Sequence, residues 1–498
     1  MIANFSLIAV LNNPAFIMSF DYDVIIIGSG PAGFSCAMQS TKFDKKVLIV
    51  EADDNHLGGS WLNKGTVPSK ALREAADLIQ DFHSQFGDEK GRKPYERFKM
   101  DDLLSYKKVA LESKNKKVKN DLIKNEVETA RGWGEIVDEH TVKVKTSLNQ
   151  SVTYTTENIL IAAGSSPEPP ISFDIDHKNV LDYNSILNIT HIPRRLVIVG
   201  SGVISFEYAT IFSSLGTTIT ILNETDEFLP FLDHEIKEDV SKVLKKKGIL
   251  IHSMATIKEV RRNPLRTCTE VMFKTQKEDR LQVLETDQVL YVGEKSPNTE
   301  NLFDKSLDIK LNNEGYIETD DSYRTGVKSI YAAGDVIGNP TSASTSFVQG
   351  RLAACSMFDI PSESPSGDIP YGIYSIPEIS AIGLTEQQAE ELGIEVTVGR
   401  AYYKNLTYAD INHRTDGLLK LVFRTDNLKL LGVHIFGDQA TDLIHLGQSI
   451  MAQDGTIKYF IEHVLNYPTY SEAYRIAAFN GVNRVYKAGV KYKNILEK

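Results

Sequence analysis

The stretch Asp23-Val24-Ile25-Ile26-Ile27-Gly28-Ser29-Gly30-Pro31-Ala32-Gly33 joins a short apolar run to a glycine-rich turn. A continuous apolar run of this length predicts a strand that is buried on both faces. The turn, Gly-x-Gly-x-x-Gly, is followed by a helical pattern and a second predicted strand, 46–51, which ends in Glu51. In this context the glycines let the backbone approach a pyrophosphate, and Glu51 can accept hydrogen bonds from ribose hydroxyls. The stretch therefore predicts a dinucleotide-binding Rossmann unit.

The same pattern recurs in the middle of the chain. A predicted strand, 195–199, leads into a second glycine turn, 200–205, and a later strand, 218–222, ends just before Asn223. Asn223 lies 23 residues after Gly200, and Glu51 lies 23 residues after Gly28. Ser205 replaces the third glycine, which we expect to require a small shift between helix and strand. Two Rossmann units in one chain imply hydride transfer between two dinucleotides.

Composition limits the classes of function. The 498 residues suggest about three domains, and the proportions of apolar and charged residues, 42% and 24%, are those of an ordinary globular protein. A net charge of −11 argues against nucleic acid as a partner, and no stretch approaches the ~18 apolar residues that span a bilayer. The first twenty residues lack the basic segment of a signal peptide, so we do not expect one. Whether the protein starts at Met1 or Met18 stays open.

The cysteines bear on location and metal binding. Cys36, Cys268 and Cys355 are odd in number and far apart, and no pair has the spacing of a redox motif or a metal site. We therefore expect a reducing compartment, the cytoplasm, and no metal cofactor.

A third stretch carries the chemistry: Gly58-Gly59-Ser60-Trp61-Leu62-Asn63-Lys64-Gly65-Thr66-Val67-Pro68-Ser69-Lys70. It resembles the redox-centre motif of the flavin-dependent disulfide reductases, with Trp61 and Thr66 where that family has its two cysteines. We interpret Trp61 as a plug at the mouth of the disulfide site. Further resemblances lie at 159–164, 330–335, 374–379 and 431–437. From about Asp21 to the C-terminus the chain resembles the pyridine nucleotide-disulfide oxidoreductases, and segments 65–73 and 466–469 resemble the soluble transhydrogenases among them.

The resemblance implies an α/β fold with two Rossmann-like domains and a C-terminal α+β interface domain. The expected FAD domain is discontinuous, at 21–162 and 291–362, and the NAD(P) domain lies between, at 163–290. After a linker at 361–367, residues 366–498 form the expected interface domain. The resemblance also implies a homodimer in which residues 466–472 face the flavin of the partner subunit.

Site residues follow from the same resemblance. Lys70 is expected beneath the flavin and Glu207 beside it, paired with Lys70 near the nicotinamide. Tyr467 stands where the disulfide reductases have a catalytic histidine, and Glu472 keeps the place of the glutamate that orients that histidine. The cofactor-binding candidates are Gly28, Gly30, Gly33, Glu51, Gly59, Ser60, Thr66, Gly134, Ala163, Gly164, Gly200, Gly202, Ile204, Asn223, Asp335 and Ala343.

The choice of nicotinamide nucleotide depends on charge. Asn223 neither repels nor pairs with the 2′-phosphate of NADP, but three acids follow it within four residues, at 224, 226 and 227. Glu294 and Lys295 replace the glycine and arginine that the family usually places against the dinucleotide. We therefore expect NAD as the nucleotide, with NADP as the alternative.

Three functions remain open at this point. The first is hydride transfer from NAD(P)H to flavin and on to a second pyridine nucleotide, without a redox-active disulfide. The second is an NADH-dependent diaphorase that reduces a quinone, a dye or oxygen. The third is an FAD-binding scaffold with little catalysis, suggested by the changes at Trp61, Thr66, Tyr467 and Glu294.

Overall fold

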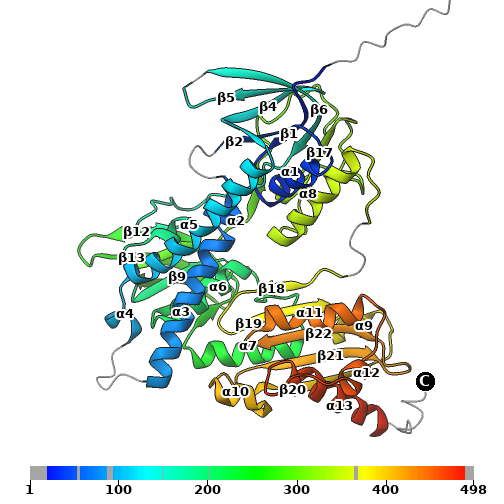
Figure 1. The fold of residues 1–498 in the computed structure, drawn as a ribbon. Coiled ribbons are helices and arrows are strands. Elements are labelled where there is room, and N and C mark those ends of the chain that lie inside the picture. The colour runs from blue at the N-terminus through cyan, green and yellow to red at the C-terminus, as the bar shows by residue number, and fades with distance from the viewer. Residues whose placement is uncertain are drawn as a thin grey trace, which may run out of the picture. The chain divides into compact units, whose positions relative to one another are not determined.

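A computed structural model describes residues 19–52, 57–86, 93–148, 150–200, 202–363 and 368–487. The chain divides into two compact units, and Figure 1 labels helices and strands of both. The first unit contains residues 1–59, 117–165 and 297–362, and the second contains 60–116, 166–296 and 363–498. The two candidate start residues, Ser201 and residues 364–367 of the predicted linker lie outside the described residues. The three predicted domain boundaries stay a prediction.

The first unit is built on a parallel sheet extended by a hairpin. Its strands run in the order β3-β2-β1-β6-β5-β4, and β17 pairs with β6. Strands β1, β2, β3, β6 and β17 are parallel, and β4 and β5 are antiparallel additions. The bounds are β1 Tyr22–Ile27, β2 Val47–Glu51, β3 Glu128–Arg131, β4 Trp133–Asp138, β5 Thr141–Lys145, β6 Ser151–Ile161 and β17 Ile330–Ala332.

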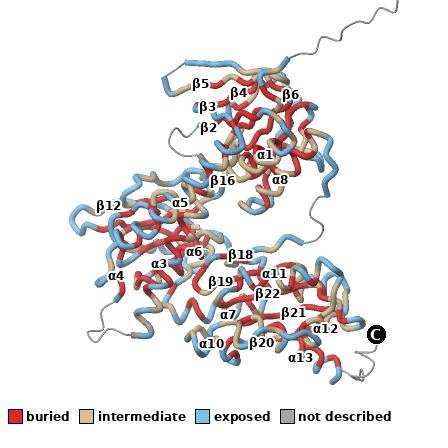
Figure 2. Tube along the Cα trace, viewed as in Figure 1, coloured by how far each residue is buried: buried red, intermediate tan, exposed pale blue. Residues whose placement is uncertain are grey.

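Two helices of the first unit pack against each other, α1 (Pro31–Thr41) and α8 (Ala343–Met357). The strand residues Ile25, Ile26 and Ile159 are fully buried, and Figure 2 colours much of this sheet as buried. The predicted apolar strand and the helix after the first glycine turn are both present. The sheet thus places the end of β1, the start of α1 and the end of β2 at one edge.

The second unit holds the second Rossmann-like sheet, with the strand order β11-β10-β9-β15-β8 and all pairs parallel. Its elements are β8 Val180–Leu181, β9 Arg195–Val199, α6 Val203–Ser214, β10 Thr218–Leu222, α7 His234–Lys246, β11 Leu250–His252 and β15 Gln288–Tyr291. A three-stranded antiparallel sheet follows β11: β12 Ala255–Asn263, β13 Cys268–Thr275 and β14 Glu278–Thr286. The predicted strands 195–199 and 218–222 are therefore confirmed.

The C-terminal part of the second unit is an antiparallel sheet in the order β18-β19-β22-β21-β20. Helix α13 packs on β20 and β21, and helix α11 packs on β19 and β22. The strands are β18 Tyr371–Ile373, β19 Glu378–Gly383, β20 Val396–Tyr402, β21 Leu418–Arg424 and β22 Leu430–Gly437. The helices are α9 Glu386–Glu391, α10 Thr407–Ile411, α11 Ala440–Met451, α12 Lys458–Glu462 and α13 Glu472–Lys487.

The segment 59–124, which begins after β2, supplies four helices. They are α2 Gly59–Asn63, α3 Thr66–Phe86, α4 Pro94–Arg97 and α5 Met100–Lys124. Helix α3 begins at Thr66, so Lys70 lies in its second turn. Within the second unit α3 packs against α6. This contact brings the part of the motif segment on α3, which includes Lys70, next to α6, the helix that follows the second glycine turn.

Candidate active site and dinucleotide sites

The first glycine turn has the geometry of a phosphate cradle. Gly28 has a φ of +104°, and a Cβ there would collide with the carbonyl of Ala162. Gly30 is the N-cap of α1, has no side-chain cap and is followed by no acid in the first helical turn. A Cβ added at Gly30 would meet no atom within 4 Å. The start of α1 therefore has no side-chain cap, no acid in its first turn and room beside Gly30, which fits the pyrophosphate of a dinucleotide.

Glu51 is tied to this turn. It is buried at the end of β2, and its Oε2 accepts from the Ser29 N–H at 3.0 Å and from Ser29 Oγ at 2.5 Å. The N–H of Gly58 donates to Ser29 Oγ at 2.8 Å. Ser29 was missed by the sequence reasoning, although its place between two glycines of the motif was a signal. It links the carboxylate expected at the ribose to the residue before Gly59.

Other predicted flavin-binding residues lie together in the first unit. Gly59 has a φ of +64°, and its added Cβ would approach Gly30 Cα to 2.8 Å. Ser165 Oγ donates to Asp335 at 3.1 Å, and Asn298 Nδ2 donates to the Ala163 carbonyl at 2.8 Å.

The remaining candidates of this unit are placed individually. Gly33 packs on the Gly28 carbonyl, and Gly134 packs on β1 and β2. A Cβ added at Gly164 would meet no atom within 4 Å. Ala343 is the first residue of α8.

The second glycine turn repeats the cradle. Gly200 has a φ of +134° and lies against the Val292 carbonyl. Gly202 is the uncapped N-cap of α6, has no acid in the first turn and leaves open space for a Cβ. Ser205 is fully buried beneath the turn, where its Oγ would lie 3.1 Å from a Cβ on Gly200. The turn accommodates the serine side chain while the N-terminus of α6 stays accessible to an anion.

Asn223 uses its side chain within its own loop. Its Nδ2 donates to the carbonyls of Thr225 at 2.9 Å and Glu227 at 3.3 Å, and its Oδ1 accepts from Thr225 Oγ1 at 3.0 Å. The residue is fully buried. In the described structure it therefore orders the turn 223–227, and its contact with a ribose stays a prediction.

Lys70 and Glu207 form a close ion pair inside the second unit. Lys70 Nζ donates to both carboxylate oxygens of Glu207, at 2.8 and 3.0 Å. The N–H of Tyr374 donates to Glu207 Oε1 at 2.9 Å, and Lys70 Nζ lies 4.6 Å from the centre of the Tyr374 ring. The exposed fraction is 26% for the Lys70 side chain and 7% for that of Glu207. The carboxylate thus fixes an ammonium group that stays open to solvent on one side.

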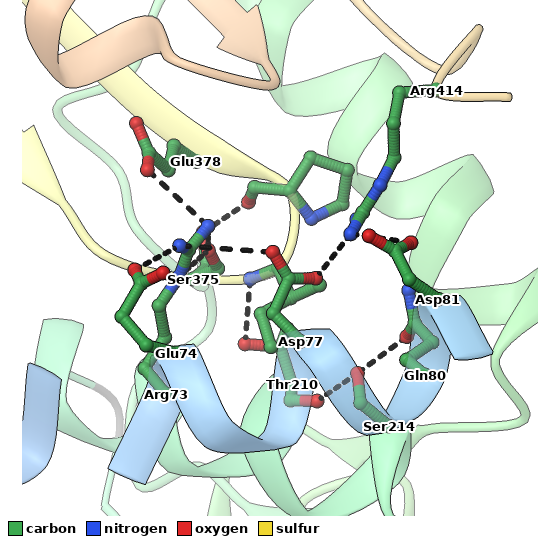
Figure 3. Close-up of polar contacts among 12 residues, drawn as sticks. Arg73, Glu74, Asp77, Gln80, Asp81, Thr210, Ser214, Ser375, Glu378 and Arg414 are labelled. Atoms are coloured by element: carbon green, nitrogen blue, oxygen red, sulfur yellow. Dashed lines mark hydrogen bonds and ion pairs between the residues drawn. The ribbon is translucent and has the colours of Figure 1, made fainter. Parts of the chain in front are cut away.

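A charged network holds the helix behind Lys70 (Figure 3). Arg73, buried on the next turn of α3, pairs with Glu378 at 3.2 Å and Asp77 at 3.7 Å, and its guanidinium contacts the Ser375 carbonyl. Arg414 pairs with Asp77 at 2.7 Å and with Asp81 at 2.6 Å. The network ties α3 to the C-terminal sheet and so positions Lys70.

Arg73 and Glu378 lie inside the motif segments 65–73 and 374–379, which assign them no role. A buried arginine requires carboxylate partners, but the sequence does not say which ones. Burial raises the pKa of Glu378, although Arg73 and Thr441 stabilise its ionised form.

The C-terminal candidates are not joined. Tyr467 is 66% exposed, and its hydroxyl lies 2.9 Å from Thr407 Oγ1. Glu472 is the first residue of α13, and its Oε2 is buried without a hydrogen-bond partner among the described residues. Within the described part of the chain no hydrogen bond connects the two side chains, so Tyr467 does not use Glu472 as the family's histidine uses its glutamate.

The two positions at which the motif resemblance places the family's cysteines hold Trp61 and Thr66. Trp61 lies on α2, with Lys114 Nζ 5.4 Å from its ring centre, and Thr66 begins α3. The thiols of Cys36, Cys268 and Cys355 are free and buried. Burial raises the pKa of Cys36 to about 12, which removes thiolate character at neutral pH.

Acidic residues surround Tyr291 at the end of β15. The Glu168 N–H donates to the Glu294 carbonyl at 2.9 Å, which brings these two segments together. Burial raises the pKa of Tyr291, and the carboxylates of Glu224, Glu168 and Glu294 raise it further. Three carboxylates therefore lie near Tyr291 at the end of the second sheet that is predicted to bind the nucleotide, and Glu294, which replaces a glycine of the family, is one of them.

Comparison with known proteins defines the class. Residues 22–350 match the pyridine nucleotide-disulphide oxidoreductase family, and residues 369–478 match the dimerisation domain of the same family. The chain belongs to this family, which makes it an FAD-dependent oxidoreductase that uses NAD(P).

Its relatives include the soluble pyridine nucleotide transhydrogenases of Pseudomonas aeruginosa and Marinomonas sp. Each is 38% identical over 475 residues, covering 94% and 93% of this chain and 99% of the relative.

Solved structures share the fold. The HOCl-induced flavoprotein disulfide reductase RclA of Escherichia coli superimposes with a TM-score of 0.81 at 23% identity, covering 92% of this chain and 99% of RclA. LpdA of Mycobacterium tuberculosis gives 0.83 at 21% identity, covering 92% and 98%. The described residues include no helix with the length and apolar character needed to cross a bilayer.

Proposed function

We propose that the chain is a homodimeric FAD-dependent oxidoreductase that takes hydride from a reduced pyridine nucleotide and passes it to a second one, without a redox-active disulfide. The observation that carries the proposal is the ion pair between Lys70 and Glu207, with contacts of 2.8 and 3.0 Å. Lys70 belongs to the same motif segment as Trp61 and Thr66. The groups suited to hydride transfer are present, and the chain has no cysteine at the positions that would pass electrons to a disulfide.

The chain's own residues have limited tasks in this reaction. A bound FAD supplies the ring that accepts and returns hydride. The uncapped N-termini of α1 and α6 would hold the pyrophosphates of the two dinucleotides. Lys70, by the family resemblance, places positive charge where the ring gains electrons, and Glu207 keeps that ammonium in position.

The C-terminal changes agree with this chemistry. Hydride transfer between nicotinamide and flavin has no leaving thiolate, so it needs no acid to protonate one. Tyr467 occupies the place of that acid and bonds to Thr407. The remaining partner, Glu472, has no thiol chemistry to support.

The homodimer and the cytoplasmic location are part of the proposal. Residues 369–478 resemble a dimerisation domain, and the exposed fractions of Val464 and Tyr467 in it are 93% and 66%. Large exposed apolar side chains next to a predicted interface are suited to contact with a second subunit. Three free, buried thiols suit a reducing compartment.

One observation favours a second candidate, an NADH-dependent diaphorase. Glu168, Glu224 and Glu294 make the nucleotide edge negative, which disfavours the additional phosphate of NADP(H). A chain that accepts only NADH would deliver hydride to a quinone, a dye or oxygen instead.

Anaerobic mixing separates the candidates. The FAD-loaded protein is mixed with NADH or NADPH, and loss of the oxidised-flavin absorption is followed; thio-NAD+ is then added and its reduction measured. Bleaching by both nucleotides with reduction of thio-NAD+ supports transhydrogenation, whereas bleaching by NADH alone supports the diaphorase. Turnover with lipoamide would contradict the proposal, because it requires a dithiol.

A further inference from the structure

The segment 374–378 leads from β18 into β19 and lies across two helices of the second unit. Towards α6, backbone N–H groups of the segment donate to Glu207 Oε1 at 2.9 Å and to Thr210 Oγ1 at 3.1 Å. Towards α3, a backbone carbonyl of the segment and the carboxylate of Glu378 both contact Arg73 (Figure 3). The segment therefore ties α3 to α6.

Tyr374 differs from its neighbours in this segment. Ser375 and Ile376 are fully buried, whereas 37% of Tyr374 is exposed. The tyrosine hydroxyl forms no hydrogen bond among the described residues. The face of the ring contacts an ammonium group instead: Lys70 Nζ lies 4.6 Å from the ring centre, inside the range of about 6 Å for an interaction between a cation and an aromatic ring.

Tyr374 acts on both members of the ion pair. Its N–H fixes the carboxylate of Glu207, and its ring limits where the ammonium of Lys70 can lie. The carboxylate alone leaves the ammonium considerable freedom, because a lysine side chain has many rotamers and 26% of this one is exposed. A second contact on the same ammonium reduces that freedom.

We propose that Tyr374 is a positioning residue for hydride transfer, whose ring holds the ammonium of Lys70 at the carboxylate of Glu207. The inference rests on the proposed function, in which the charge of Lys70 acts on the flavin as it gains electrons. The backbone N–H that binds Glu207 is present in every residue except proline, so a substitution at Tyr374 isolates the ring. The hydroxyl has no part in this role, and phenylalanine should replace tyrosine without loss.

Anaerobic reduction of the FAD-loaded protein by NADH measures the effect on the reaction. Tyr374→Leu removes the ring, so the limiting rate of flavin reduction should fall about three- to tenfold, while the NADH concentration for half the limiting rate should change by less than about twofold. Tyr374→Phe should reduce at the parental rate. In Lys70→Met, the additional change Tyr374→Leu should cause no further loss, because the ring has no ammonium to hold. A further loss there, or a slow Tyr374→Phe, would overturn the proposal.

A measurement without turnover tests the contact itself. The FAD-loaded protein is treated briefly with succinimidyl acetate, and acetylation of Lys70 is measured by mass spectrometry of its peptides. Acetylation should be at least about twofold faster in Tyr374→Leu, where the ring no longer covers the amine, and parental in Tyr374→Phe. Unchanged acetylation of Lys70 in Tyr374→Leu would also overturn the proposal.

Tyr402→Leu is the matched control. Tyr402 is 38% exposed, its ring centre lies 5.5 Å from Lys404 Nζ, and its strand, β20, forms the opposite edge of the sheet from β18. The control should keep the parental reduction rate and the parental acetylation of Lys70. Equal losses in Tyr402→Leu and Tyr374→Leu would show a general effect of removing a surface tyrosine and reject the proposal.

The same variants separate this inference from the proposed function. Parental reduction in Lys70→Met would contradict the proposed function itself. A slow Lys70→Met together with a parental Tyr374→Leu would reject the role of Tyr374 alone. If Tyr374→Leu lost FAD, Tyr374→Met would take its place with the same expected results.

Discussion

The two glycine turns share the features of their described glycines and have different surroundings. Each has a positive-φ glycine pressed against a neighbouring carbonyl, Gly28 on Ala162 and Gly200 on Val292, and each ends in an uncapped helix N-terminus. They differ at the end of the following strand. In the first unit a glutamate bonds to Ser29 of the turn, whereas in the second unit the side chain of Asn223 bonds, among the described residues, to its own loop. Ser201, the counterpart of Ser29 in the second turn, lies outside the described residues.

This difference suits the two roles that we propose for the turns. Glu51, the predicted ribose acceptor, is held by Ser29, which would favour a cofactor that stays bound. Asn223 presents no charge and is committed to Thr225 and Glu227, so the second site lacks a fixed carboxylate for the ribose. A nucleotide that enters and leaves in every cycle requires weaker binding than a resident flavin.

A carboxylate placed at each helix N-cap tests most directly which turn binds FAD and which binds the nicotinamide nucleotide. Asp is a good N-cap residue, so Gly30→Asp and Gly202→Asp should fold, but the charge occupies the pyrophosphate position. We expect Gly30→Asp to lose FAD, and Gly202→Asp to keep FAD while kcat/KM for NADH falls about 100-fold or more. Flavin content and anaerobic reduction rates measure both effects. Loss of FAD in Gly202→Asp would show that the two turns have been assigned to the wrong cofactors.

The next effect concerns Lys70 and its partner. Lys70→Met keeps the length of the side chain and removes the charge, so the fold and flavin content should persist while flavin reduction by NADH slows by about 10- to 100-fold. Lys64→Met, in the same motif segment, is the control and should reduce at the parental rate. Equal rates for Lys70→Met and the parent protein would remove Lys70 from the reaction.

The sequence predicted the strands and both glycine turns because their signals are local. The run 23–27 is apolar throughout, and Gly28 and Gly200 are required by backbone conformations that other residues rarely adopt. The networks of the second unit were not predicted. Arg73 reaches Glu378 across 305 positions of the sequence, and a pairing between such distant charges is decided only by how helices and sheets pack.

The same limit applied to Asn223 and Tyr374. An asparagine 23 residues after the first glycine of the turn matches the ribose position by count, yet its amide bonds to the loop that follows. Tyr374 lies in the motif segment 374–379, but its contact with Lys70 is defined only by the packing of that segment against α3. The spacing in the sequence predicts which residue lies at a site. The direction in which its polar atoms point depends on the residues packed around it, which the sequence does not specify.

A smaller effect is expected at the ends of the two strands. Glu51→Gln should weaken FAD binding about tenfold, because a neutral amide accepts more weakly from Ser29 and from a ribose than a carboxylate does. Asn223→Ala removes bonds inside the loop 223–227, so it should lower the free energy of unfolding by about 1–3 kcal/mol and leave FAD content unchanged. Flavin release titrations and thermal unfolding measure the two. If Asn223→Ala weakened NADH binding without loss of stability, the asparagine would be a ribose ligand after all.

The smallest predicted effect concerns the preference of the second turn for NADH over NADPH. Glu224 and Glu294 are partly solvated, so each carboxylate should affect the 2′-phosphate of NADPH by less than about 1 kcal/mol, or a factor of about five. The double variant Glu224→Gln/Glu294→Gln should therefore raise kcat/KM for NADPH several-fold and change that for NADH much less, because NADH lacks this phosphate. The advantage should diminish as salt rises, since screening already reduces the repulsion in the parent protein. An equal gain for both nucleotides would place the repulsion at the shared pyrophosphate. The acidic edge would then lower the affinity for NADH and NADPH equally. In that case repulsion of the 2′-phosphate would not oppose the proposed exchange of hydride between NADPH and NAD+.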